Sequence, residues 1–461
     1  MKRIGILTAG GDTPALNATI QGAVARANQR RVEVFGFIKG FSSLLSPSVP
    51  YVHLNPLFTE IPELDPNRGG TLIGASRAFV DPSDTRMMDE VADRLSRLKV
   101  SGLICVGGDG TLNGLQPLAE RFPVVLAPKT IDNDLGLNHR DEPDEWVREA
   151  APDAPGYRYR RQPSEVAFDL DGIVNYATPG YATSVYVSVE GVRRLRTTAE
   201  SHRRIAIVEV MGRHSGYIAL GTAYGQPDII LIPESPIDIE RLVKRVAHLY
   251  ELQKNVVIVC GEGIVDERGR ELGAAAQAPH DPAGNVLLAG AADALREILI
   301  ERFGDSYFQN FRRAESAKAA IFSRKVGHTQ RGGRPILFDR FYAAQLGGKA
   351  LDMLLEGQNN AVSVLQWSRD KGFSVDSFDG NGFRDRWGRI HARQLHPALY
   401  DPERMRPSQT GVEYLLPIFT NAVGHADVEY IRESIFDSGS LFRPFHSVNT
   451  DIAKRIRYLE S

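Results

Sequence analysis

One stretch of this chain, residues 103–135, places acidic turns directly after two short apolar runs. The first run, 103–106, leads into a glycine turn at 107–111, and the second, 124–127, leads into the turn 130–134. Short apolar runs of this kind are typical of strands buried in a parallel sheet. Residues just beyond the carboxyl ends of neighbouring strands line one crevice in such sheets. We therefore expect the two acidic turns to face each other.

The residue types in these turns suit phosphate chemistry. Gly107 and Gly108 let the backbone approach a phosphate, and the helix that follows offers free N–H donors at its N-terminus. Asp109 can hold Mg²⁺ through water molecules. Asp132 and Asp134 add two carboxylates, one able to act as a base toward a hydroxyl and the other to orient a residue or a metal-bound water. The alternative is that the aspartates only cap their turns, which is common for one aspartate and less so for two beside a lysine.

Strand and helix patterns alternate along most of the chain. Such alternation predicts an α/β fold with mostly parallel sheets, and 461 residues suit two or three domains. Further strands are expected at residues 4–7, 32–38, 205–210, 228–232, 256–259 and 319–326. Helices are expected at 87–98, 181–194, 215–224 and 340–355, and around Leu242 and Leu295. After Gly372 the pattern weakens, with shorter helices near 428–435 and 451–459.

Residues 139–165 interrupt this rhythm. The segment is rich in Asp, Glu, Arg and Pro and contains a basic-aromatic cluster at 157–161. Its composition favours a solvated surface insertion. The alternative is a lid, or an arm between subunits, whose arginines approach a bound phosphate.

Composition excludes several classes of function. The 55 basic and 57 acidic residues give a formal net charge of −2, which favours neither nucleic acid nor an anionic membrane as a partner. No apolar run approaches the length of a membrane span. The only two cysteines, Cys105 and Cys260, lie in apolar runs, which indicates core thiols and a reducing cytoplasm.

Three more clusters follow predicted strands. His328 and Arg331 stand three apart before paired glycines and could converge on a phosphate, since arginine offers a fork of donors. Arg213 offers the same chemistry, and Glu262 could accept hydrogen bonds from sugar hydroxyls. Taken singly, each could equally be a solvated turn residue. Their common position at strand ends favours one shared site.

Seven motifs in order carry a resemblance to the 6-phosphofructokinase family, from the N-terminus to about Leu355. They are LTAGGDTPALN at 7–17, GGTLIGASR at 69–77, VGGDGT at 106–111, PKTIDND at 128–134, HRRIAIVEVMGRHSGYIAL at 202–220, GEG at 261–263 and GHTQRGGRPILFDR at 327–340. NAD kinases and lipid kinases are similar only at the glycine–aspartate turn.

The resemblance implies two Rossmann-like three-layer domains with parallel-rich sheets and the active site in the cleft between them. Residues 1–138 would bind the phosphoryl donor and Mg²⁺, and 139–165 would be the surface insertion. Residues 166–335 would bind fructose 6-phosphate, and 336–461 would return to the donor domain and add a C-terminal extension. The implied partners are ATP or pyrophosphate, fructose 6-phosphate and further copies of the chain, as a homodimer or homotetramer.

The resemblance also implies phosphoryl transfer to the C1 hydroxyl of fructose 6-phosphate. Asp132 would be the base, and Asp109 would hold the metal. The catalytic residues would be Asp132, Arg213, Arg77 and Lys129. The donor would be bound by Gly11, Arg77, Gly108, Asp109, Gly110 and Thr111. The sugar phosphate would be bound by Thr130, Asp132, Met211, Gly212, Arg213, Glu262, Arg324, His328 and Arg331, and by Arg204 of a neighbouring subunit.

The sequence departs from the family pattern at several positions. Phe322 stands where a phosphate-binding arginine is usual, six residues before the histidine, and Arg324 is the nearest substitute. Gln21 and Ala25 replace arginines that bind an allosteric nucleotide in many bacterial members, which argues against that regulation.

Two residues indicate different phosphoryl donors. Gly110 resembles ATP-dependent members, in which glycine leaves room for the donor's inner phosphate, whereas pyrophosphate-dependent members usually have aspartate there. Lys129 is typical of pyrophosphate-dependent enzymes. Because an opening decides whether a nucleotide fits and an ammonium suits either donor, we predict ATP. The alternatives are a reversible pyrophosphate-dependent enzyme and a non-catalytic regulatory paralogue that binds sugar phosphate.

Overall fold

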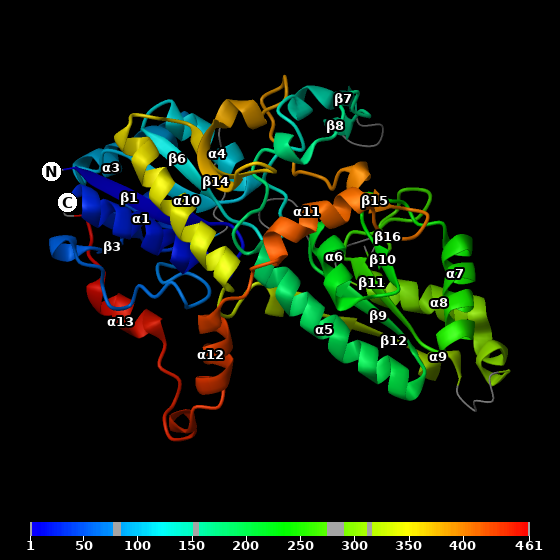
Figure 1. Ribbon diagram of the computed structural model, residues 1–461. Coiled ribbons are helices and arrows are strands. Elements are labelled where there is room, and N and C mark those ends of the chain that lie inside the picture. Colours follow the sequence, from blue (N-terminus) through cyan, green and yellow to red (C-terminus); the bar gives the residue numbers. More distant parts are fainter. Residues whose placement is uncertain (1, 77–83, 151–155, 274–289, 311–315, 460–461) are drawn as a thin grey trace.

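Two parallel-rich sheets, each packed between helices, make up most of the chain in the computed structural model (Figure 1). The structure describes residues 2–76, 84–150, 156–273, 290–310 and 316–459. This architecture confirms the predicted α/β class. None of the helices in these ranges is long and apolar enough to cross a membrane.

The first sheet is parallel in its interior and antiparallel at its edges, where β14 pairs with β13 and β3 with β2. Its strands lie in the order β14 (Gly372–Asp379), β13 (Ala361–Ser368), β6 (Val124–Pro128), β5 (Leu103–Gly107), β1 (Arg3–Ala9), β2 (Glu33–Phe37) and β3 (Tyr51–His53), and β4 (Ala75–Ser76) pairs with β1. The turns that follow β1, β5 and β6 therefore lie side by side at one edge.

Alternate residues of β1 enter different cores, as a strand buried on both faces requires. Ile4 and Ile6 pack with helices α1 (Leu16–Arg30) and α10 (Leu337–Leu355), whereas Leu7 packs with α2 (Phe41–Leu45), α3 (Thr85–Arg97) and α4 (Asp109–Ala119). Gly22 allows α1 to touch α10 closely, since a Cβ there would lie 1.9 Å from the carbonyl oxygen of Ala344.

The second sheet is parallel throughout. Its order is β10 (Ile229–Leu231), β11 (Val256–Gly261), β9 (Ile205–Val210) and β12 (Ile321–Lys325). On one face lie α5 (Tyr181–His202) and α6 (Tyr217–Gly221), and on the other lie α7 (Ile239–Gln253), α8 (Ala291–Gln309) and the short α9 (Ala317–Ala320). The strands predicted in this half are confirmed within a few residues. The helix predicted at 181–194 extends to His202 as α5, and the helix predicted at 215–224 is the short α6 followed by a 3-10 turn, Thr222–Gly225.

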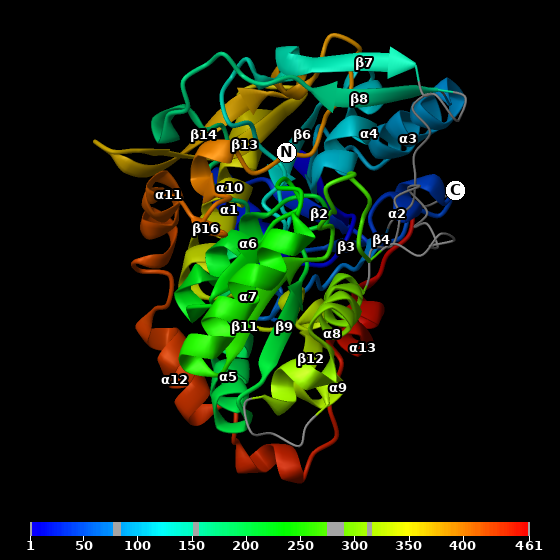
Figure 2. The same cartoon turned by 90° about the vertical axis from the view of Figure 1, so that its right-hand side faces the viewer.

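The C-terminal part of the chain returns to both sheets. Helix α11 (Gln409–Phe419), near the short pair β15 (Tyr400–Asp401) and β16 (Arg406–Pro407), packs on the second half, where Tyr414 stacks on Tyr176 at 4.7 Å between ring centroids. Helix α12 (His425–Glu433) and the following turn project away from both sheets in Figures 1 and 2. Helix α13 (Val448–Arg455) then leads back to β3.

The segment between the halves contains a two-stranded antiparallel hairpin, β7 (Trp146–Ala150) and β8 (Tyr157–Arg161). Figure 2 shows it at the top of the molecule, near α4. Arg161 is mostly buried and forms ion pairs of 2.8 Å with both Glu142 and Glu145. The composition predicts a solvated surface insertion; the structure adds that these ion pairs and strand pairing order it into a hairpin, most of whose strand residues are exposed.

The prediction that the pattern weakens after Gly372 was wrong for β14, and β13 was missed altogether. Strand β13 pairs with β6 in the first sheet, and β14 covers its outer edge. A strand with one exposed edge carries polar residues, as β14 does, and its apolar pattern is correspondingly weak.

Candidate active site

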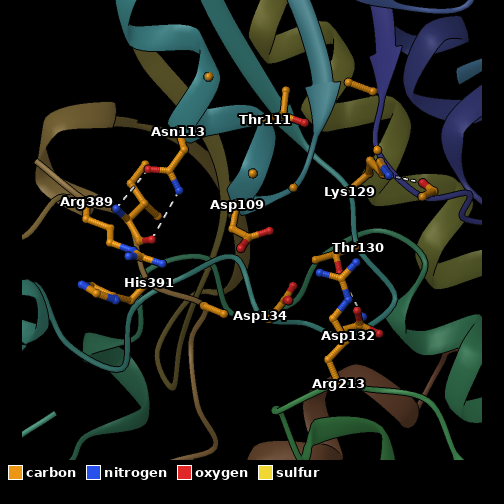
Figure 3. Close-up of a pocket in the computed structure, with 18 of the residues that line it drawn as sticks. Asp109, Thr111, Asn113, Lys129, Thr130, Asp132, Asp134, Arg213, Arg389 and His391 are labelled. Carbon is orange, nitrogen blue, oxygen red and sulfur yellow. Dashed lines mark hydrogen bonds between the residues drawn. The ribbon is translucent and has the colours of Figure 1, made fainter. Parts of the chain in front are cut away.

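A cavity of about 890 Å³ lies beyond the carboxyl ends of the first sheet's central strands. The two acidic turns face each other across it, as the sequence predicted (Figure 3). The predicted site residues that line it are Gly11, Gly108, Asp109, Gly110, Thr111, Lys129, Thr130, Asp132, Arg213 and Arg331.

The turn after β5 forms the N-terminus of α4. Gly108 is the residue before the helix and Asp109 is its first residue, so the free N–H groups of the first turn lie beside the carboxylate. A Cβ built on Gly110 would meet no atom within 4 Å. The cavity is therefore open at Gly110, next to an end of the helix that favours negative charge.

The turn after β6 aims Asp132 into the cavity. The N–H of Asp132 donates to Thr130 Oγ1 at 3.0 Å, and the next residue, Asn133, adopts a left-handed conformation with φ of 57°. Asn133 is fixed in turn by hydrogen bonds with Tyr414 and Thr178. Asp132 is 4% exposed, and its Oδ1 has no hydrogen-bond partner among the described residues. This oxygen is therefore buried and unpaired within the part of the chain that the structure describes.

Asp134 lies between the two other carboxylates. Burial, and secondarily the charges of Asp109 and Asp132, raise the pKa of Asp134 to about 7, and Arg213 opposes the shift. The described residues contain no group of three His, Cys, Asp or Glu side chains placed to hold a metal ion. One carboxylate together with phosphate oxygens and water is, however, how Mg²⁺ is commonly held. Asp109 fits that role.

Lys129 is buried at the junction of two turns. Its Nζ donates a hydrogen bond to the carbonyl oxygen of Gly11. Burial lowers the pKa of Lys129 to about 8, and the charge of Arg331 adds to the effect, so the ammonium is poorly solvated. The charges of Asp12, Asp132 and Asp134 oppose the shift, and a phosphate in the cavity would add to them.

Residues that follow β9 and β11 of the second sheet lie beside the site; of those predicted there, Arg213 lines the cavity, whereas Met211, Gly212 and Glu262 do not. Glu262 Oε1 accepts hydrogen bonds from the N–H groups of Gly212 at 3.3 Å and Arg213 at 2.9 Å. Burial raises the pKa of Glu262 to about 7. Gln330, which sequence reasoning did not single out, is fully buried and accepts from Met211 N–H at 3.0 Å. The loop after β9 is thus fixed by two buried side chains.

Comparison with known proteins identifies the family to which this chain belongs. The family model described as phosphofructokinase matches residues 3–139 and 167–354. The chain belongs to the phosphofructokinase family. It is 33% identical over 368 residues to a pyrophosphate–fructose 6-phosphate 1-phosphotransferase of Amycolatopsis methanolica, covering 79% of this chain and 90% of that protein. It is 32% identical over 378 residues to an ATP-dependent 6-phosphofructokinase 2 of Streptomyces coelicolor, covering 79% and 91%.

Solved phosphofructokinase structures share the fold. A pyrophosphate-dependent phosphofructokinase from Marinobacter aquaeolei aligns with a TM-score of 0.67 over 92% of each chain, at 17% identity. The phosphofructokinase of Saccharomyces cerevisiae aligns with a TM-score of 0.56, covering 82% of this chain and 45% of that one, at 21% identity. At these identities the likeness establishes the fold alone.

Several residues predicted from the phosphofructokinase motifs do not line the cavity. Arg204 precedes β9 and so lies at the end of that strand opposite to Met211. Arg324 is exposed on β12, with its guanidinium 5.4 Å from the ring of Phe322, and His328 is exposed in a short turn. Arg77 lies outside the described residues.

Sequence reasoning missed a wall of this phosphofructokinase site that contains two arginines and a histidine. Arg384, Arg389 and His391 line the cavity, although they follow the region that the family model matches. Arg393 is 2% exposed and donates to the carbonyl oxygens of Asn133 at 2.7 Å and Asn175 at 2.9 Å. It thereby fixes the turn that carries Asp132. The sequence does contain one sign of this wall, the concentration of arginine in residues 384–393. It was overlooked because the helix and strand pattern in this part of the chain is weak.

Proposed function

We propose that this phosphofructokinase transfers a phosphoryl group from ATP to the C1 hydroxyl of fructose 6-phosphate in a Mg²⁺-dependent reaction that gives fructose 1,6-bisphosphate. The observation that carries the choice of donor is the open space at Gly110, beside the N-terminus of α4. The relatives include both ATP-dependent and pyrophosphate-dependent enzymes, so the donor rests on this local geometry.

In the proposed reaction, Asp132 takes the proton of the C1 hydroxyl through its unpartnered Oδ1. Arg213 and Lys129 offset negative charge on the phosphoryl group as it passes, and Arg77 is proposed to do the same. Asp109 would hold Mg²⁺, which when bound neutralises charge on the donor phosphates. The N–H groups at the start of α4 bind those phosphates.

The sugar phosphate is proposed to lie between the two sheets. Thr130 and Arg331 reach it from the cavity wall, and Glu262 with the loop 211–213 contacts its hydroxyls. The exposed His328 and Arg324 are proposed to reach its 6-phosphate. By this assignment, residues 1–138 bind the donor and 166–335 bind the sugar.

We also propose that the active form is a homodimer or homotetramer. Arg204 lies away from the cavity of its own chain, which supports its use in the site of a neighbouring copy. The turn after α12 exposes Phe436, Phe442 and Phe445, apolar surface that a second copy would cover. We assign the enzyme to the cytoplasm, because Cys105 and Cys260 are buried and unpaired.

The donor is tested by initial rates. The enzyme is given fructose 6-phosphate and Mg²⁺ with either ATP or pyrophosphate, and fructose 1,6-bisphosphate is measured in a coupled assay. Turnover with ATP is expected. Turnover with pyrophosphate alone would reject ATP and establish the alternative. Binding of fructose 6-phosphate without turnover from either donor would indicate a regulatory paralogue.

A further inference from the structure

Two segments outside the region matched by the family model pack against each other. The ring of Trp146, at the start of the β7–β8 hairpin, stacks on the imidazole of His391 with centroids 3.8 Å apart and planes 10° apart. The guanidinium of Arg148 lies 5.1 Å from the ring of Trp387. The hairpin therefore supports the outer side of the segment 384–392.

The inner side of this segment is fixed to the donor turn. Asn113, in the first turns of α4, accepts from the N–H of Ile390 at 3.1 Å and donates to the carbonyl oxygen of Ile390 at 3.3 Å. Arg384 donates to the carbonyl oxygen of Leu112 at 3.0 Å. Because α4 begins with Asp109 and Gly110, this segment belongs structurally to the donor side of the cavity.

The segment is also rigid within itself. The buried carboxylate of Asp385 accepts from the N–H groups of Trp387 and Arg389, both at 2.9 Å, and pairs with His391 Nε2 at 2.8 Å. One carboxylate thus fixes both ends of a tight loop, and Arg389 projects from it.

Among the arginines of this loop, Arg389 has the fewest side-chain interactions. Its guanidinium lies 4.7 Å from the ring of Tyr159 in β8, and among the described residues it makes no hydrogen bond. In Figure 3, Arg389 and His391 lie on one side of the cavity and Lys129 on the other, with Asp109 between them. An exposed guanidinium held by an aromatic face keeps its fork of donors available for an anion.

We propose that the segment 384–392, supported by the hairpin β7–β8, is a wall of the donor site, and that Arg389 binds phosphates of the donor other than the one transferred. The ligand class is a nucleoside triphosphate, so this inference rests on the proposed function. A guanidinium bound to phosphate makes two charge-assisted hydrogen bonds, which are among the stronger polar contacts in proteins.

The test compares two arginines of the same loop. Arg386 is exposed, lies beside Trp387 and donates a 3.3 Å hydrogen bond to the carbonyl oxygen of Asp144, but it does not line the cavity. Arg386→Gln therefore removes the same charge from the same loop outside the site. We expect Arg389→Gln to weaken ATP binding about tenfold, with the KM for fructose 6-phosphate unchanged. Arg386→Gln should bind ATP as the wild type does. Binding is measured by calorimetry and by tryptophan fluorescence, since Trp387 lies in this wall and Trp146 stacks against it.

A second pair of variants tests whether the ring of Tyr159 supports Arg389. Tyr159→Phe keeps the aromatic face against Arg389 and should bind ATP normally, whereas Tyr159→Leu should weaken binding severalfold. If wild type binds ATP and Arg389→Gln binds it equally well, the wall is rejected while the proposed donor stands. If wild type binds only pyrophosphate, the proposed donor is rejected, and this inference, which assigns a nucleoside triphosphate, is rejected with it. Equal weakening by Arg386→Gln would also reject a specific role for Arg389.

Discussion

The ammonium of Lys129 donates a hydrogen bond to the carbonyl oxygen of Gly11, which joins the turn after β6 to the turn after β1. This contact fixes two walls of the cavity but leaves a positive charge in a poorly solvated place. The same position that suits phosphate binding is therefore costly for the unliganded fold.

Lys129→Met should stabilise the folded protein and weaken its binding of the phosphoryl donor. Burial lowers the pKa of Lys129 from 10.5 to about 8, so below pH 8 the folded state carries a charge that the unfolded state solvates better. After allowance for the lost hydrogen bond, the free energy of unfolding at pH 7 should rise by about 2 kcal/mol. The gain should shrink as the pH rises from about 8 toward 10.5, because the folded wild type then loses its proton and no longer buries a charge, while the unfolded state keeps its proton.

Urea unfolding at pH 7 and pH 10 measures this effect, and donor binding measures the impairment. Lys371→Met, at an exposed lysine, is the control and should change neither. A Lys129→Met protein that is less stable than wild type at pH 7 would contradict the account.

Gly110→Asp should weaken the use of ATP as donor without destabilising the fold. A Cβ at Gly110 meets no atom within 4 Å, and an acidic residue in the first turn of α4 suits the helix dipole. The free energy of unfolding should therefore be unchanged or slightly higher. The KM for ATP should rise about tenfold or more, because like charges placed together cost several kcal/mol. Gly110→Ala separates size from charge and should have the smaller effect; equal effects would point to crowding alone.

Asp132→Asn should abolish most turnover without loss of sugar phosphate binding. The variant keeps the shape of the side chain and the N–H contact to Thr130 but cannot take a proton. We expect kcat to fall by about 10²- to 10⁴-fold. Steady-state rates give kcat, and equilibrium binding of fructose 6-phosphate gives the matched control. Turnover within threefold of wild type would mean that another group is the base.

Glu262→Gln should alter how stability depends on pH. Burial raises the pKa of Glu262 from 4.5 to about 7, so its stabilising contribution is complete below pH 4.5 and is lost as the pH rises through about 7. The glutamine is neutral throughout. The stability of the variant relative to wild type should therefore increase between pH 5 and pH 8, by up to about 3 kcal/mol. Unfolding curves at both pH values measure this difference, and a constant difference would contradict the raised pKa.

The fold was predictable where strands are buried on both faces. Such strands are continuous apolar runs, as in β5 and β9, and they mark the sheet whatever packs around them. Edge strands such as β14 carry polar residues on one face, so their signal is lost among loops. The hairpin β7–β8 was hidden for a related reason, since its order depends on pairs such as Arg161 with Glu145 that no periodicity reveals.

The candidate site was predictable only in its turns. Asp109 and Asp132 follow apolar strands, and chain topology alone brings such turns together. Arg389 and Arg393 could not be assigned, because their places depend on tertiary contacts with Tyr159 and Asn133 far away in the chain. Local sequence carries no record of such contacts.

The hydrogen bonds from Arg393 to the turn that carries Asp132 have a consequence for synthesis of the protein. The guanidinium reaches the carbonyl oxygen of Asn133 across 260 positions of chain. During translation the two sheets can form domain by domain and Thr178 can already hold Asn133, but the contacts from Arg393 are missing until the chain has emerged beyond residue 393. A prematurely terminated product that contains the whole family-matched region would therefore lack part of the support for the turn that carries Asp132.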